Sequence, residues 1–150
     1  MKSSKVRLSK ILSHCGICSR REAEKYIKEG YLKVNGKIFT DYSIESKQIK
    51  KISIFDKVLN KKKTRIWIFN KPINYVSSNK EQGNQRSLFK LFPKNIPRLV
   101  SVGRLDIMSE GLMIFTNNPT LSSFLEKPKN KITRKYKVIV KGDLSEDLFV

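Results

Sequence analysis

Asp106 is the residue of this sequence that is best placed to do chemistry. It follows Gly103 and Arg104, precedes Ser109-Glu110-Gly111, and stands between two apolar stretches. A loop held by two rigid strands is a common place for a functional side chain. On this spacing alone, however, an Asp that caps a turn is the better interpretation, because a single loop carboxylate does not define a site.

Cys15 and Cys18 form a Cys-x-x-Cys pair beside His14, which is a spacing used to hold zinc. A structural zinc site needs four ligands, and the sequence contains no further cysteine or histidine. We therefore expect no metal, and we interpret the cysteines as small residues at a joint between two helices. A Ser-His-Asp triad would need His14, which is far in sequence from any candidate nucleophile. The seven glycines form no phosphate-binding pattern, so we expect no nucleotide or other small-molecule cofactor.

The first third of the chain predicts two helices and a small sheet. Leu8, Ile11 and Leu12 have helical spacing, and Ser19 with Glu22 forms a capping box at the start of a second helix, which Gly30 ends. Residues 31–39 alternate around an Asn-Gly turn and predict a hairpin, and residues 52–54 predict a further strand.

Three basic residues of the second helix, Arg20, Arg21 and Lys25, lie on its polar side. There they would face either a phosphate backbone or solvent. For any single lysine, a solvated face is the better interpretation.

Residues 60–64 are polar and basic and predict a linker. After this linker the sequence pattern predicts mainly strands and few helices. We expect a buried strand over 65–70, a polar loop over 77–87, a short helix or turn over 87–92, a helix over 119–126, and strands over 98–103, 111–116 and 136–140.

The charge of the chain predicts a polyanionic partner. The formal net charge is +19; residues 1–63 contain 17 Lys and Arg against 6 Asp and Glu, and residues 64–150 contain 15 against 7. Because both halves are basic, nucleic acid is expected to contact most of the length. A lysine-rich genomic composition accounts for a share of this charge, but rarely leaves acidic residues so scarce.

No apolar run approaches the roughly 20 residues of a membrane span, and the N-terminus lacks the apolar stretch of a secretory signal. We expect a cytoplasmic protein without membrane association, and a monomer.

Two stretches of the sequence resemble known families. Residues 18–24 (CSRREAE) and 30–36 (GYLKVNG) resemble the S4-type RNA-binding module over about residues 5–57. Residues 101–106 (SVGRLD) and 109–117 (SEGLMIFTN) resemble the signature of the RsuA/RluB family of ribosomal-RNA pseudouridine synthases, and residues 69–72 and 134–138 agree in order. Residues 97–101 (PRLVS) favour the large-subunit branch.

The resemblance implies an activity and roles for three residues. A pseudouridine synthase detaches uracil from ribose, rotates it and rejoins it through carbon, so no cofactor is required. Asp106 would be the catalytic carboxylate, either as a nucleophile or as a base toward a sugar proton, in a pocket with little water. Arg104 would contact RNA. Tyr136 would stack on a uracil that is turned out of the RNA helix, whereas without the family it would be interpreted as a core tyrosine.

The resemblance also predicts an α+β fold in two parts: an S4-type RNA-binding domain (two helices plus a small sheet) at 1–60, and at 61–150 the N-terminal part of an incomplete synthase domain with a mainly antiparallel sheet. Nothing after Tyr136 matches the basic residue that pairs with the family's Asp, so we expect a fragment or a truncated product with exposed apolar surface. The alternative function is a non-enzymatic RNA-binding protein in which only the S4-type module acts. For either, ribosomal RNA is the expected partner.

Overall fold

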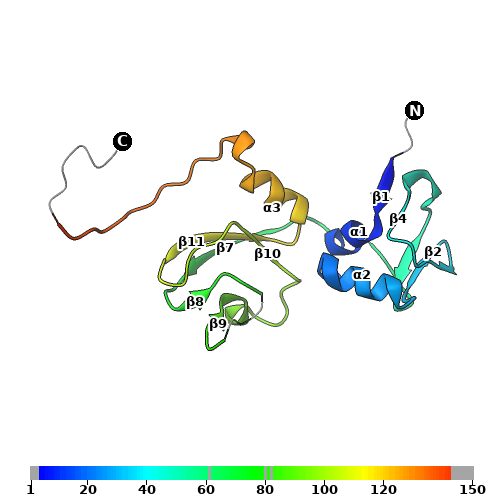
Figure 1. The fold of residues 1–150 in the computed structure, drawn as a ribbon, viewed down its shortest axis with the longest axis horizontal. Helices are drawn as coiled ribbons and strands as arrows, with labels where there is room; N and C mark the ends of the chain where they lie inside the picture. Colours follow the sequence, from blue (N-terminus) through cyan, green and yellow to red (C-terminus); the bar gives the residue numbers. More distant parts are fainter. Residues whose placement is uncertain (1–3, 61, 80, 82, 143–150) are drawn as a thin grey trace.

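Two separate groups of buried side chains organise the chain. The computed structural model describes residues 4–60, 62–79, 81 and 83–142. The buried side chains of one group come from the sequence range 8–54. The other group includes Leu88, Met113 and Phe115. Figure 1 shows the corresponding two bodies, joined by a thin connecting loop. The arrangement is α+β with mainly antiparallel sheets, as predicted.

The elements of the first body are β1 (Lys5–Arg7), α1 (Leu8–His14), α2 (Arg20–Lys28), β2 (Leu32–Val34), β3 (Lys37–Ile38), β4 (Ser43–Glu45), a 3-10 helix (Ser46–Gln48), β5 (Ile52–Ile54) and β6 (Lys57–Val58). The capping box of α2 is confirmed. The Glu22 amide donates to Ser19 Oγ at 3.2 Å, and the Ser19 amide donates to Glu22 Oε2 at 2.7 Å. These bonds satisfy amide groups that the first turn of a helix leaves free.

Two hairpins form the larger sheet of the first body, in the strand order β3-β2-β5-β6, and β1 pairs with β4 in a separate antiparallel sheet. The predicted Asn35-Gly36 turn joins β2 to β3, and a Phe55-Asp56 turn joins β5 to β6. All four turn residues have positive φ, at 51° and 84° in the first turn and 48° and 61° in the second. Positive φ at both central positions is the type I′ geometry, whose twist suits a two-residue hairpin.

The elements of the second body are β7 (Ile66–Lys71), β8 (Tyr75–Val76), β9 (Arg86–Ser87), a 3-10 helix (Leu88–Leu91), β10 (Val100–Val102), β11 (Gly111–Thr116), α3 (Pro119–Glu126) and a 3-10 helix (Pro128–Asn130). Antiparallel pairing gives the order β10-β11-β7, with Val102 opposite Ile114 and Lys71 opposite Gly111. The predicted helices at 87–92 and 119–126 are both present. β8 and β9 form a short parallel pair, and β9 lies within the region 77–87 that was expected to be loop.

The sheet of the second body buries one face and exposes the other. Met113 and Phe115 of β11 face the core, whereas Ile68 of β7 is 76% exposed and Leu112 is 68% exposed. The strand predicted at 65–70 is present as β7, but the prediction that it is buried is wrong: exposed and covered residues alternate along it, because among the described residues only one of its faces is covered. The predicted exposed apolar surface is present.

Residues 131–142 follow α3 as an extended segment that leaves the body (Figure 1). The strand predicted at 136–140 is not formed. A strand requires a hydrogen-bonded neighbour, and within the described part of the chain this segment has none, so Tyr136 is 67% and Ile139 88% exposed. Its alternating pattern alone does not create a strand.

Among the described residues, none of the helices has both the length and the apolar character needed to cross a lipid bilayer.

Candidate active site

Asp106 lies in the loop 103–110 that joins β10 to the neighbouring strand β11. Gly103 opens this loop with a φ of 78°, a left-handed conformation that glycine adopts without steric cost. Leu105 then packs half-buried against the core of the second body. Ser77 holds the same residue from the other side, since its hydroxyl donates to Leu105 O at 2.6 Å and accepts from Leu105 N at 3.1 Å. The backbone immediately before Asp106 is thereby fixed.

Lys71, the last residue of β7, holds the backbone of the loop from Asp106 to Ser109. Its side chain is fully buried, and its ammonium donates to Asp106 O at 2.9 Å and to Ser109 O at 2.7 Å. Longer bonds reach Pro72 O at 3.1 Å and Ile107 O at 3.4 Å. An ammonium has three donors and no acceptor, so a ring of carbonyl oxygens satisfies it well.

Burial disfavours the charged form of Lys71, and the Asp106 loop partly offsets this effect. Burial lowers the pKa of Lys71 from its ordinary value, because the charged form loses its hydration, and the negative charge of Asp106 opposes this shift. The bonds of the ammonium nevertheless go to loop carbonyls, which leaves the Asp106 carboxylate available. Lys71 is therefore a positioning residue beneath the loop.

Asp106 itself is exposed, and so is Arg104. The water-poor pocket expected around this carboxylate is not formed by the described residues, because no segment among them covers the loop. The geometry presents a carboxylate on a firmly held backbone toward the surface. Such a group can act as a nucleophile or as a base toward a ligand that brings its own enclosure.

Arg104 and Tyr136 line a common cavity of about 370 Å³ on the β10-β11 side of the sheet. Its lining combines apolar side chains, including Val102 and Leu112, with the basic side chains Arg104, Arg134 and Lys135. Apolar and basic groups side by side suit a flat ring that carries a phosphate. Asp106 does not line this cavity, so the structure brings two of the three predicted residues together and leaves the third at the adjacent loop.

Two asparagines that follow β11 tie the linker to the second body. Asn117 accepts from Arg65 N at 2.8 Å and donates to Lys63 O at 2.9 Å, while Asn118 donates to Thr64 Oγ1 at 2.9 Å. Asn118 also caps α3 by accepting from Thr120 N at 2.9 Å. The chain is therefore fixed from Lys63 onward, and the connection between the bodies is short.

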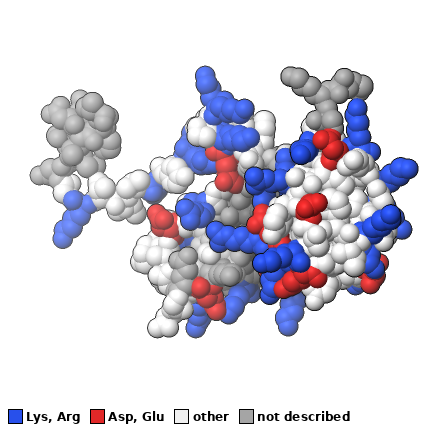
Figure 2. All heavy atoms as spheres, turned by 45° about the vertical axis from the view of Figure 1, so that its right-hand side comes forward, with Lys and Arg blue, Asp and Glu red and all other residues white. Residues whose placement is uncertain are grey.

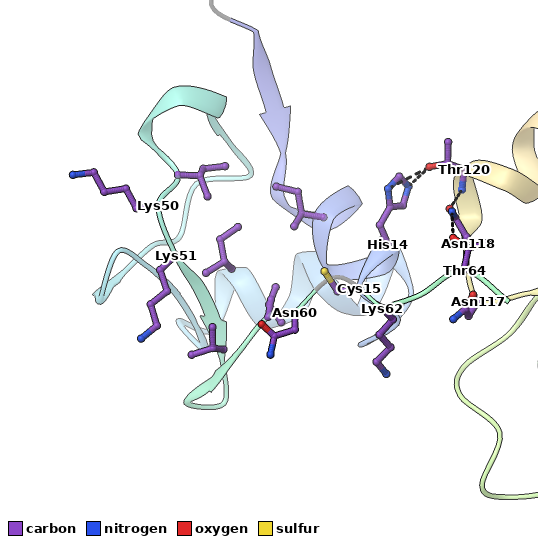
Figure 3. Close-up of a pocket in the computed structure, with 15 residues that line it drawn as sticks. His14, Cys15, Lys50, Lys51, Asn60, Lys62, Thr64, Asn117, Asn118 and Thr120 are labelled. Atoms are coloured by element: carbon purple, nitrogen blue, oxygen red, sulfur yellow. Dashed lines mark hydrogen bonds between the residues drawn. The ribbon is translucent and has the colours of Figure 1, made fainter.

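His14 at the end of α1 meets Thr120 at the start of α3 (Figure 3). Its ring nitrogens lie 3.3 and 3.4 Å from Thr120 Oγ1. The pKa of His14 is lowered, first by burial and then by the positive charges of Lys10 and Arg20. A cavity of about 720 Å³ lies beside this contact and is lined by both bodies and by the linker, including Asn60, Lys62 and Thr64.

Arg20 lies at this same junction. With Lys10 of the first body and Lys127 and Lys129 of the second, it lines a hollow of about 300 Å³ whose lining residues include no carboxylate. Figure 2 shows Lys and Arg side chains over both bodies, with several where the bodies meet. An RNA backbone that contacts one body at the junction would therefore find cations on the other.

The other two predicted basic residues lie elsewhere on α2. Arg21 is exposed, and Lys25 is exposed and pairs with Glu29 at 3.8 Å. Solvent-exposed ion pairs contribute little to stability, so this pairing leaves Lys25 accessible to a phosphate. The structure groups only Arg20 with the junction.

Cys15 and Cys18 lie at the joint between α1 and α2, as predicted, and both are free thiols. Burial raises the pKa of each thiol; Glu22 adds to the shift at Cys18, whereas Lys62 opposes it at Cys15. The protonated thiol is a poor nucleophile and a poor metal ligand.

The sequence pointed to Asp106 as a candidate but not to the two residues that hold its loop. Lys71 entered only through the family resemblance of residues 69–72, and it was given no role of its own. A lysine at the end of an apolar strand was a usable signal, because a lysine is seldom fully buried without partners. Ser77 gave no signal, because it lies in a polar loop 28 residues away from the residue that it holds.

Comparison with known proteins agrees with this arrangement. The S4 domain family matches residues 6–45, and the family described as RNA pseudouridylate synthase matches residues 65–149. An uncharacterized RNA pseudouridine synthase of Rickettsia bellii is 37% identical over 91% of this chain and 60% of its own length. Proteins named ribosomal large subunit pseudouridine synthase B are 38% identical in Buchnera aphidicola, over 94% of this chain and 59% of theirs, and 34% identical in Bacillus subtilis, over 91% and 56%.

The chain belongs to the RNA pseudouridylate synthase family and carries an S4 domain at its N-terminus. It spans about 60% of the length of the curated relatives that it matches.

Proposed function

We propose that this chain is the RNA-binding and Asp106-bearing portion of a pseudouridine synthase that acts on a uridine of ribosomal RNA. The observation that carries the proposal is the Asp106 loop, whose backbone is held by the buried ammonium of Lys71 while its carboxylate faces outward. Two relatives are named for the ribosomal large subunit, which supports that RNA as the substrate.

The chemistry requires a carboxylate and no cofactor. The bond between ribose C1′ and uracil N1 breaks, a bond between C1′ and C5 forms, the C5 proton is lost and N1 gains one, so the product is an isomer. Asp106 supports this either by attacking the nucleotide or by taking a sugar proton. Arg104 contacts the RNA backbone, and Tyr136 stacks on the displaced uracil.

The two bodies divide the work. Residues 1–60 form the S4-type domain, whose Arg20, Arg21 and Lys25 supply phosphate affinity, and residues 61–150 form part of the catalytic domain. The basic hollow at the junction supports a single RNA that contacts both bodies. A monomer in the cytoplasm remains the prediction.

The test is pseudouridine mapping on ribosomal RNA after incubation with the chain, with the variant Asp106→Asn, and with the matched control Asp41→Asn. Asp41 is also an exposed loop carboxylate, but it lies in the first body. We expect product from the unaltered chain and from the control, and none from Asp106→Asn. Equal product from both variants would remove Asp106 from the mechanism.

A non-enzymatic RNA-binding role is the second candidate, and the exposure of Asp106 and of one sheet face favours it. It predicts salt-sensitive RNA binding without isomerisation by any of the three proteins, and binding that survives removal of residues 64–150.

A further inference from the structure

The two hairpins of the first body share a backbone but differ in their turn residues. Asn35-Gly36 and Phe55-Asp56 occupy the same two positions, all with positive φ. Asn and Gly are the residues that favour this conformation, whereas a bulky side chain such as Phe seldom adopts it. The second turn thus keeps a large aromatic ring at a position where its backbone disfavours one.

The side chain of Asn35 has a structural use that Phe55 lacks. Asn35 accepts from the amides of Lys50 at 2.9 Å and Lys51 at 3.0 Å, and it donates to Gln48 O at 2.6 Å. These bonds tie its turn to the segment that immediately precedes β5. Phe55 has no polar side-chain group, so its ring must be explained by what it touches.

Phe55 completes a cluster of three rings at the end of α2, which we call the aromatic platform: Tyr26, Tyr31 and Phe55. The Phe55 ring lies 5.0 Å from that of Tyr31 and 5.1 Å from that of Tyr26. Tyr26 meets both other rings edge-on, at interplanar angles of 83° and 76°, and packs against the core of the first body. It therefore supports the other two rings from below.

The outer two rings are open to solvent in almost equal measure. Tyr31 is 48% exposed and Phe55 is 47% exposed. The Phe55 amide donates to Tyr31 O at 3.3 Å, which fixes one backbone against the other. Rigid, half-exposed rings can accept a further flat ring without a large loss of side-chain entropy.

The charges beside the platform are mixed. Lys28 and Lys57 are exposed within three residues of a platform ring, but so are Glu29 and Asp56, and Lys33 bonds to Asp56 Oδ1 at 2.6 Å. The choice of a polyanion over an apolar protein surface therefore rests on the net charge of the whole chain, which is +19.

We propose that the aromatic platform is a stacking site for an unpaired nucleobase of the bound RNA, without preference for its identity. Base stacking on aromatic side chains tolerates any sequence, because every base has a flat face. The platform would hold a single-stranded segment that flanks the modified site. This inference rests on the RNA-binding part of the proposed function, and it is independent of the chemistry of Asp106.

The test compares the affinity of the 150-residue chain for a single-stranded oligouridylate with that of four variants. Phe55→Leu and Tyr31→Leu keep an apolar side chain but remove the ring. Phe55→Tyr restores a ring at the same backbone position, and Tyr42→Leu removes a tyrosine that is 49% exposed outside the platform. Circular dichroism establishes that each variant is folded.

We expect Phe55→Leu and Tyr31→Leu each to bind about tenfold more weakly, while Phe55→Tyr and Tyr42→Leu stay within about twofold of the unaltered chain. The slope of log affinity against log salt should not change in any variant, because no phosphate contact is removed. A duplex RNA of equal length should show no such loss.

Unchanged affinity in both leucine variants would overturn the platform and leave the proposed function standing. An equal loss in Tyr42→Leu, or a flatter salt dependence in Phe55→Leu, would also overturn it, since the loss would then not be one of stacking. If the unaltered chain bound no RNA, both the platform and the RNA-binding part of the proposed function would fail.

Discussion

The two bodies of this chain solve the problem of positioning functional groups differently. The first packs α1, α2 and its sheet around one continuous group of buried side chains. The second has a smaller buried group and leaves Ile68 and Leu112 exposed on the other face of its sheet. Its site loop is nevertheless held, by Lys71 and Ser77. Local polar bonds can therefore fix a site loop even where a sheet face is uncovered.

The largest expected effect separates the two faces of the second sheet. Phe115→Ala removes a fully buried ring, and we expect it to lower the free energy of unfolding of the second body by roughly 3–5 kcal/mol. Ile68→Ala, its control on the exposed face, should change this value by less than about 0.5 kcal/mol. Trp67 is the only tryptophan and lies in β7, so its fluorescence during denaturation reports on the second body alone.

The denaturation of Phe115→Ala also tests whether the two bodies unfold separately. Circular dichroism follows both bodies, whereas Trp67 follows one. If Phe115→Ala shifted the whole circular dichroism transition together with the fluorescence, the bodies would unfold as one unit and could not be treated as separate.

Lys71→Met should lower the free energy of unfolding of the second body by roughly 2–3 kcal/mol, because the loop carbonyls lose a charged donor. Pseudouridine formation should fall as well, since the Asp106 backbone loses its support. Lys37→Met, in an exposed strand of the first body, is the control and should be close to neutral. An active Lys71→Met protein of normal stability would show that Ser77 alone fixes the loop.

The first body was largely predictable because its signals are local. The capping box at Ser19 and the Asn35-Gly36 turn each act within four residues, so their structural effect follows directly from the sequence. The bonds of Lys71 to the Asp106 loop span 35 to 38 residues of sequence, and no periodicity reveals such partners. The prediction of a strand at 136–140 failed for the same reason, because a strand depends on a neighbour that is distant in sequence as much as on its own residues.

Ser19→Ala tests a feature that is confined to the first body. Loss of the cap should lower the free energy of unfolding by about 1 kcal/mol in circular dichroism while leaving the Trp67 transition unchanged. Ser43→Ala, at an exposed position of β4, serves as the control. A shift in the Trp67 transition would indicate that α2 stabilises the second body.

The smallest effect concerns the contact between the bodies. The pKa of His14 is lower in the folded chain than its ordinary value of 6.5, so the unfolded chain binds the proton more readily. The contribution of His14 to stability should therefore be present above pH 6.5 and be lost as the pH falls through 6.5 toward the lower pKa of the folded chain. His14→Gln, which keeps a partner for Thr120, should reduce this dependence. An unaltered pH dependence in that variant would assign it to other groups.

The division of labour between the bodies is tested most directly by measuring RNA affinity and single-turnover isomerisation together for Asp106→Asn. The account predicts an affinity within about twofold of the unaltered chain and a rate at least about 100-fold lower, because the carboxylate acts on the nucleotide and not in holding the RNA. A weakened affinity with an unchanged rate would contradict it, since Asp106 would then belong to binding.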